Sequence, residues 1–382
     1  MTIVLSGAII TLLLITLYVL VRWGNERCHG SEPVGLLTFM AILFTSGLDM
    51  GLIIFPLTEF PVYAEDAQYQ FSNPLAVGFG FWGFLIWVFY FITTFYFCVI
   101  EPRVKFFELK PVKIINNLVI ISTCAFTAYL FLVNIAWYAP EVGEAWGYLV
   151  VFLILLAAVY SSTDIKYLKI LSVASTWLFF ALIAGMWWWM DADASYAAEA
   201  ASAIGTGYFA ELHEFILPLS DYHAFYLFWW FAWSVMIGQF VSRFVGGLKT
   251  YQLLLALLII PSIPLAIWFS VLYYYFANAI EITLLLKLAM VTVGVIFVIN
   301  SVDSLVRLYT DNLGIKVEKL GRPRFILLNV SVLSALVLLF KFTPFEIQSV
   351  GLVVIGLYAA AITTIVWRHR PALAAINDSS AG

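Results

Sequence analysis

Aromatic side chains gather in two apolar stretches of the sequence, and their types point to binding rather than covalent chemistry. The two sets are Trp82, Trp87 and Tyr90, then Trp229, Trp230 and Trp233. A quaternary ammonium ion cannot donate hydrogen bonds, so ring faces replace its water, and each desolvated contact contributes about 0.5–2 kcal/mol. Trp233 lies too deep in its apolar stretch for the interfacial position usual for tryptophan. The pattern predicts an aromatic box for an onium cation; lipid-facing or packing rings are the alternative.

A carboxylate flanked by glycines interrupts another apolar stretch. Asp49 lies in the sequence Gly47-Leu48-Asp49-Met50-Gly51. A charge within hydrocarbon is costly enough to mark a functional group by default. Neighbouring glycines favour an unwound segment whose freed carbonyls line a cavity. The alternative is a kinked helix in which Asp49 bonds to a neighbouring helix.

Four side chains with oxygen atoms fall within five positions of a third apolar stretch. They are Asn300, Ser301, Asp303 and Ser304. Such a cluster serves either hydrogen bonding between helices or a site for a hard cation, which prefers oxygen ligands. The residues alone leave both interpretations open.

The composition shows what kind of chain must position these groups. Of 382 residues, 63% are hydrophobic and 11% are charged, against about 45–50% and 25% in soluble domains. The chain is therefore an integral membrane protein, which excludes soluble enzymes and secreted domains. A net charge of −4 without a basic patch gives no support for nucleic-acid binding. Three scattered cysteines and four histidines without ligand spacing predict no disulfide framework and no resident cofactor.

Eleven apolar segments are long enough to cross about 30 Å of hydrocarbon. They are 3–21, 35–58, 76–100, 114–137, 145–161, 168–190, 222–243, 250–276, 282–305, 324–342 and 347–367. Their continuous hydrophobicity, without alternation, excludes a membrane β-barrel. The sequence predicts an all-α bundle.

Basic residues orient these segments. With the N-terminus outside, all of the 19 Lys and Arg residues except Lys287 and Lys341 fall in inner loops, as the positive-inside rule requires. The C-terminus is then inside. The longest outer connection, 191–221, contains alternating apolar and acidic residues from Tyr208 to Leu219, which predicts a helix lying on the membrane surface.

In these elements the sequence resembles the betaine/choline/carnitine transporter family. The family's Trp-Trp-x-x-Trp-Ser element, which is followed by a Gly and an Arg, corresponds to residues 229–234, with Gly238 and Arg243 after them. Its Trp-Gly-x-x-x-Trp-x-x-Tyr element is met by Trp82-Gly83 with Trp87 and Tyr90, and its glycine-rich break before a Glu by 47–51 with Glu59. Its Phe-x-x-Thr-Ser-x-Asp-Ser element reads 297–304. The resemblance covers about 35–305.

The resemblance implies a LeuT-type inverted repeat of five plus five helices, preceded by one extra N-terminal span. The expected parts are 1–34 as anchor helix and inner loop, 35–190 as first repeat, 191–221 as outer connection, 222–367 as second repeat and 368–382 as short inner tail. It further implies interrupted second and seventh spans that hold substrate near the midplane. The family's Pro after Trp-Ser is, however, Val235 here.

The resemblance also implies roles for individual residues. The six aromatic residues named above form the two walls of the box. The implied Na⁺ ligands are the carbonyls of Thr45, Leu48 and Phe297 with the side chains of Asn300 and Ser301, and Thr123 and Thr127 match a second Na⁺ site. Asn300 replaces a family Thr, and Asp49 stands where sodium-coupled betaine carriers have Gly. Asp49 would either pair with a cation lacking its own carboxylate or carry a coupling proton.

The sequence thus predicts a secondary transporter, not an enzyme, that imports a quaternary-ammonium compound by alternating access. Choline ranks first, then glycine betaine or a related onium compound, with coupling to Na⁺ or H⁺. A transport-inactive relative, acting as a ligand sensor or as a subunit of a membrane complex, is the alternative. No His or Cys lies beside Asp49, which disfavours a membrane-embedded enzyme. The expected location is a bacterial inner membrane, and the resemblance implies a trimer.

Overall fold

The structure, a computed structural model, describes residues 1–48, 51–138, 143–371, 373 and 376. Asp49 lies outside the described residues. The described chain is nearly all helical, and ten of its helices are long and apolar enough to cross a membrane. An eleventh apolar segment is split into two shorter helices, α2 (Leu36–Gly47) and α3 (Gly51–Glu65). The predicted bundle is confirmed.

After the first helix, α1 (Thr2–Trp23), the spans fall into two sets of five. The first set comprises α2/α3, α4/α5 (Pro74–Trp82 and Leu85–Phe95), α7 (Lys110–Tyr138), α8 (Glu144–Ser161) and α9 (Ile165–Trp189). The second comprises α12 (Asp221–Val241), α13/α14 (Thr250–Ile259 and Ser262–Ala277), α15 (Leu284–Leu313), α17 (Arg322–Phe342) and α18 (Ile347–Arg368). This succession matches the predicted five-plus-five order; the exact division into parts stays a prediction.

The second apolar segment is interrupted where the glycines predict it. Helix α2 ends at Gly47, and Leu48 adopts an extended conformation with φ −127° and ψ 154°. The carbonyls at this helix end lack intrahelical partners, and hydrocarbon supplies no water to satisfy them. The Tyr90 hydroxyl donates to the Gly47 carbonyl at 2.9 Å, and the Ser301 hydroxyl donates to the Leu48 carbonyl at 2.9 Å. Side chains of two other spans therefore cap the break.

The expected interruption of the seventh span is wrong. Helix α12 runs without a break through the Trp-Trp-x-x-Trp-Ser element. Val235 explains the difference, because it retains the backbone N–H and avoids the ring clash through which a proline interrupts a helix. Breaks lie instead in the second span of each set, at Gly83–Phe84 and Ile260–Pro261, and Phe84 has a positive φ of 21°.

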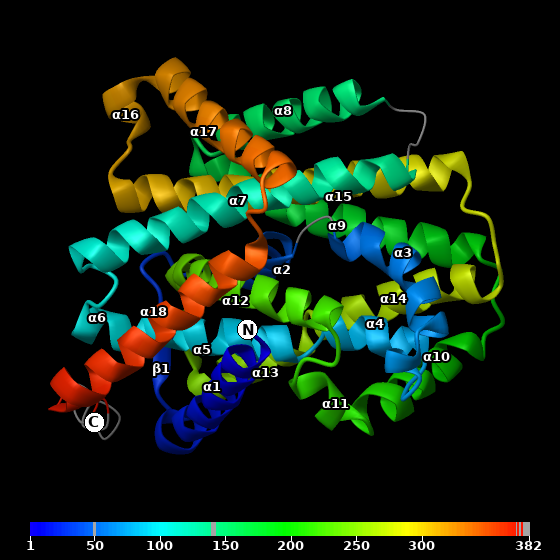
Figure 1. Cartoon of the computed structure of the whole chain (residues 1–382), viewed down its shortest axis with the longest axis horizontal. Coiled ribbons are helices and arrows are strands. Elements are labelled where there is room, and N and C mark those ends of the chain that lie inside the picture. Colours follow the sequence, from blue (N-terminus) through cyan, green and yellow to red (C-terminus); the bar gives the residue numbers. More distant parts are fainter. Residues whose placement is uncertain (49–50, 139–142, 372, 374–375, 377–382) are drawn as a thin grey trace.

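Helix α12 occupies the middle of the bundle, with α5 and α18 packed against it (Figure 1). Helix α15 packs against α2, α7, α8 and α9, so it joins both sets. Helices α8 and α17 lie at one edge and α1 lies at the other (Figure 1). The short strands β1 (Arg27–His29) and β2 (Gly246–Lys249) pair antiparallel, which ties the loop after α1 to the loop after α12. No pattern in the sequence predicts this ribbon.

The outer connection contains one helix before the predicted stretch 208–219 and a short one within it. The longer one is α10 (Tyr196–Ile204), and the shorter is α11 (Leu212–Ile216), after a π-helical turn at Gly205–Phe209. Tyr208 and Phe215 are buried and their ring centroids lie 4.9 Å apart. The connection is therefore packed onto the bundle by its aromatic side chains.

We predict that Gly238→Ala destabilises the protein by about 1–3 kcal/mol, as overpacking of a tight core does. A Cβ atom at Gly238 would lie 2.7 Å from the backbone carbonyl carbon of Thr93 on α5. Thermal unfolding in detergent measures the effect. Gly356→Ala on α18 is the matched control, because nothing lies within 4 Å of its added Cβ. Equal unfolding temperatures for the two variants would contradict the close packing of α12 on α5.

Candidate functional site

Indole rings from α4 and α12 meet inside the bundle. The Trp229 and Trp230 rings are stacked with centroids 4.7 Å apart, and Trp82 meets them edge-on at 5.7 Å and 5.0 Å. Tyr226 completes the group, with its ring 5.8 Å from Trp82 and 5.7 Å from Trp229. We call these four residues the aromatic cluster. All four are at most 3% exposed, so they face the protein interior and not lipid.

Several buried indole N–H groups have no acceptor. Among the described residues these are the ring nitrogens of Trp82, Trp87, Trp229 and Trp233. By contrast, the Trp230 nitrogen donates to the Phe81 carbonyl at 2.9 Å. Buried donors are nearly always paired, so each orphan calls for an explanation such as a water or a bound ligand. All four orphans belong to the set that the sequence predicts to bind substrate.

The other predicted aromatic residues lie apart from the cluster. Trp87 and Tyr90 form a separate edge-to-face pair with centroids 5.5 Å apart, and the Tyr90 hydroxyl caps the break after α2. Trp233 stacks on no other described ring, although it is buried one turn beyond Trp229. Tyr226 was missed by sequence analysis, yet its position four residues before Trp230 places both side chains on one helix face.

The predicted Na⁺ ligands converge only in part. The Ser301 hydroxyl lies 3.3 Å from the Thr45 carbonyl oxygen and 2.9 Å from that of Leu48. Asn300, however, directs its amide nitrogen at the Thr45 hydroxyl at 2.5 Å, while its oxygen accepts from Ser172. A hard cation takes oxygen ligands, so Asn300 in this orientation does not fit the site. Donors of α15 satisfy the carbonyls at the end of α2 instead.

The remaining predicted metal ligands make ordinary helix contacts. Thr123 donates to the Val119 carbonyl at 3.0 Å, and Thr127 donates to the Thr123 carbonyl at 3.2 Å. The ring of Phe297 packs between aromatic rings, including Phe44 at 6.1 Å. Both Na⁺ sites stay predictions.

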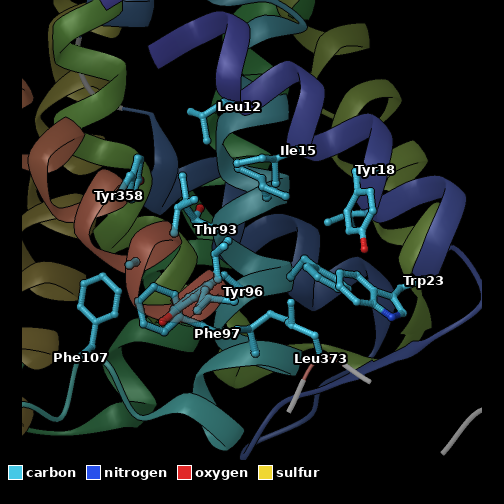
Figure 2. Close-up of a pocket in the computed structure, with 18 residues that line it drawn as sticks. Leu12, Ile15, Tyr18, Trp23, Thr93, Tyr96, Phe97, Phe107, Tyr358 and Leu373 are labelled. Atoms are coloured by element: carbon cyan, nitrogen blue, oxygen red, sulfur yellow. The ribbon is translucent and has the colours of Figure 1, made fainter. Parts of the chain in front are cut away.

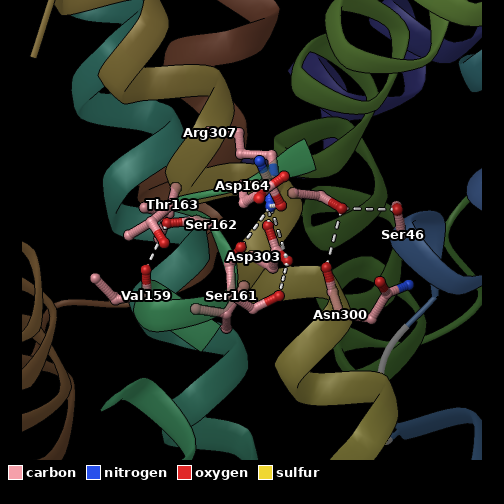
Figure 3. A network of polar contacts seen from close by, with 12 residues as sticks. Ser46, Val159, Ser161, Ser162, Thr163, Asp164, Asn300, Asp303 and Arg307 are labelled. Carbon is pink, nitrogen blue, oxygen red and sulfur yellow. Dashed lines mark hydrogen bonds and ion pairs between the residues drawn. The ribbon is translucent and has the colours of Figure 1, made fainter. Parts of the chain in front are cut away.

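The side chains of the polar cluster on α15 bond to residues of three other helices, α2, α8 and α9 (Figure 3). Ser304 shares a hydrogen bond with Ser46 of α2 at 2.8 Å. Asp303, fully buried, forms an ion pair with Arg307 at 2.5 Å and accepts from Ser161 at the end of α8. Arg307 also donates to the Ser161 carbonyl at 2.6 Å. These contacts favour helix-to-helix bonding for this cluster.

Two cavities lie away from the aromatic cluster. One of about 240 Å³ is lined almost entirely by apolar side chains of α1, of α18 and of α5 with the turn that follows it, including Leu12, Tyr96 and Tyr358 (Figure 2). It lies between the N-terminal helix and α18, while α1 also packs against α5. The other, of about 400 Å³, is polar and contains Arg243 and Asp311, which form an ion pair at 2.8 Å. It lies where the inner loops were predicted.

Known proteins resemble this chain weakly in sequence and more fully in fold. No family model matches the chain. A Vibrio parahaemolyticus glycine betaine/proline/choline/ectoine transporter is 32% identical over 68 residues, which cover 15% of this chain and 12% of that protein. A Haemophilus influenzae protein named as an uncharacterized transporter is 23% identical over 284 residues, covering 63% of this chain and 42% of the other. The matches thus cover less than half of either relative.

A solved structure extends the likeness to nearly the whole chain. It is a substrate-bound, outward-open Na⁺-coupled sialic acid symporter with a TM-score of 0.51 and 14% identity, covering 93% of this chain and 84% of that one. The fold is therefore of the LeuT type. In short stretches of sequence the chain is similar to proteins named as glycine betaine and choline transporters. The predicted resemblance to betaine and choline transporters is thereby confirmed at low identity over part of the chain, and the relatives that carry functional names are named as transporters.

We predict that Arg307→Leu lowers the free energy of unfolding by about 3–5 kcal/mol, because it leaves the carboxylate of Asp303 buried without its partner. Chemical or thermal unfolding of the purified protein measures this loss. Lys166→Leu is the control, since its 3.8 Å ion pair with Asp164 is exposed and contributes about 0–1 kcal/mol. A loss for Arg307→Leu no greater than the control's would show that the pair does not hold α15 against α8.

Proposed function

We propose that this protein is a secondary transporter that imports a quaternary-ammonium compound. Choline is the first candidate, followed by glycine betaine or a related onium compound. The observation that carries the proposal is the aromatic cluster, in which buried rings from α4 and α12 meet inside a LeuT-type bundle. Ring faces in a desolvated interior are the groups that best bind a cation without hydrogen-bond donors. Relatives named as betaine and choline transporters support the same substrate class.

Substrate would enter by parting rings that touch each other in this structure. The unpartnered N–H groups of Trp82 and Trp229 offer donors to an oxygen of the ligand, a hydroxyl in choline or a carboxylate in betaine. The rings hold the methylated nitrogen while these donors orient the rest of the molecule. The end of α2 at Gly47–Leu48, capped by Tyr90, supplies the helix interruption that alternating access requires.

Coupling to Na⁺ or to H⁺ belongs to the same proposal. Carbonyls at the negative end of the α2 dipole attract a cation, which supports an ion near Thr45, Leu48 and Ser301 if Asn300 turns its oxygen inward. Asp49, the proposed partner for choline or carrier of a coupling proton, precedes the start of α3. We place the protein in a bacterial inner membrane with its N-terminus outside, and propose a trimer.

Binding by the cluster is testable with two substitutions. We predict that Trp229→Leu weakens binding of choline and glycine betaine by about 2- to 30-fold, since loss of one ring contact removes about 0.5–2 kcal/mol. Trp233→Leu is expected to act similarly. Trp188→Leu is the control, because Trp188 is 87% exposed on α9. Isothermal titration in detergent measures affinity; unchanged affinity in both the Trp229→Leu and the Trp233→Leu variants would remove the assignment.

Transport itself is testable in proteoliposomes. We predict that labelled choline or glycine betaine accumulates inside vesicles when an inward ion gradient is imposed. Addition of an ionophore that collapses the gradient should abolish accumulation. Retained binding without any uptake, under either a Na⁺ or a H⁺ gradient, would contradict transport and favour the alternative of a ligand sensor or complex subunit.

A further inference from the structure

A second buried carboxylate, in addition to Asp303, lies on α3, the helix that follows the end of α2. Glu59 is 3% exposed and accepts hydrogen bonds from three tyrosine hydroxyls. Tyr63 donates to its Oε2 at 3.0 Å, and Tyr226 donates to its Oε1 at 2.5 Å. Tyr222 donates to the same Oε1. In the sequence Glu59 stands out only as the acidic residue that follows the glycine-rich element.

Glu59 differs from Asp303 in what neutralises it. Asp303 has the guanidinium of Arg307, whereas no Lys, Arg or His in the described part of the chain forms an ion pair with Glu59. The titratable groups that face Glu59 are the three tyrosines that donate to it and Tyr69. Nearby, His223 stacks on Phe81 at 4.3 Å and accepts from the Leu219 N–H, so it does not reach the carboxylate.

An ionised carboxylate only accepts hydrogen bonds, and three converging hydroxyls suit that form. A protonated carboxyl carries a donor of its own and accepts more weakly, so protonation favours a state in which one tyrosine turns its hydroxyl around to accept that proton or moves away. Two of the donors, Tyr222 and Tyr226, belong to α12 while Glu59 belongs to α3. The charge on Glu59 therefore determines how strongly the outer part of α3 holds the start of α12.

The position of the group connects solvent to the aromatic cluster. Tyr222 is 39% exposed, so a proton has one side chain to pass before it reaches Glu59. On the other side, Tyr226 belongs to the aromatic cluster and lies 5.9 Å from Trp230. A change at the carboxylate is thus transmitted directly to rings that would hold the substrate.

We propose that Glu59 is a proton-binding site through which uptake is coupled to the proton gradient. The ligand is a single proton taken from the outer solution onto a carboxylate oxygen. Its binding loosens the contact between α3 and α12 and lets the rings part. This inference rests on the proposed transport of an onium compound and names the ion that accompanies it.

Glu59→Gln tests the inference, because glutamine keeps the shape and cannot be charged. In Na⁺-free proteoliposomes, wild-type protein should accumulate labelled choline when the outside is acidic. We expect Glu59→Gln to keep exchange of external for internal choline but to lose accumulation driven by pH. Glu65→Gln, an exposed carboxylate at the end of the same helix, should behave as wild type. Full pH-driven accumulation by Glu59→Gln would overturn the assignment.

A second pair of variants keeps the inference testable if Glu59→Gln does not fold. Tyr222→Phe and Tyr63→Phe each remove one donor to the carboxylate and should raise the pH midpoint of choline uptake by about one unit. Tyr222→Phe also removes a bond between α3 and α12, so it alone should speed exchange. Unshifted midpoints in both variants would refute the proton site. Accumulation driven only by Na⁺ would refute the proton site while leaving onium transport intact. If the wild-type protein binds neither choline nor glycine betaine, the proposed transport itself is refuted.

Discussion

The fold depends on satisfying the backbone at the break between α2 and α3. Free carbonyls in hydrocarbon cost several kcal/mol each, because no water can reach them. The hydroxyl of Tyr90 on α5 and that of Ser301 on α15 supply the missing donors. These two bonds fix α2 against one helix of each set of five spans. The unpaired carbonyls at the end of α2, which would cost free energy by themselves, thus hold α2 to two other spans of the bundle.

Polar groups elsewhere in the bundle follow the same constraint with different partners. Asp303 is neutralised by Arg307 and serves to lock α15 to α8, a permanent structural contact. Glu59 is held by hydroxyl groups alone, so its charge can be cancelled by a proton without leaving a basic group unpaired. The two buried acids differ in this respect, and only the second is suited to a change of state during transport.

Much of the architecture could be predicted, because membrane spans are recognisable in a sequence as long apolar runs whose connecting loops carry basic residues on one side of the membrane. The break at Gly47–Leu48 and the interior position of Trp82 and Trp229 were also foreseeable from residue type. The continuity of α12 was not foreseeable, because it depends on a single residue, the Val235 that follows the Trp-Ser pair. Nothing in the spacing showed which way the amide of Asn300 points.

The Glu59 site was equally hidden, although parts of it were visible. Tyr63 and Tyr226 each lie four residues from another member, Glu59 and Tyr222, so each pair shares a helix face. The two pairs are more than 150 residues apart in the sequence, and only the packing of α3 against α12 brings them onto one carboxylate. Convergence of this kind is a property of tertiary structure and leaves no local pattern.

The central functional claim is that the aromatic cluster recognises positive charge rather than bulk. The most direct measurement compares the affinity of choline with that of its neutral carbon isostere, in which a tert-butyl group replaces trimethylammonium. Since shape and apolar area are nearly the same, cation–π attraction predicts that choline binds at least roughly 30-fold more tightly, about 2 kcal/mol. Equal or tighter binding of the neutral compound would contradict the account.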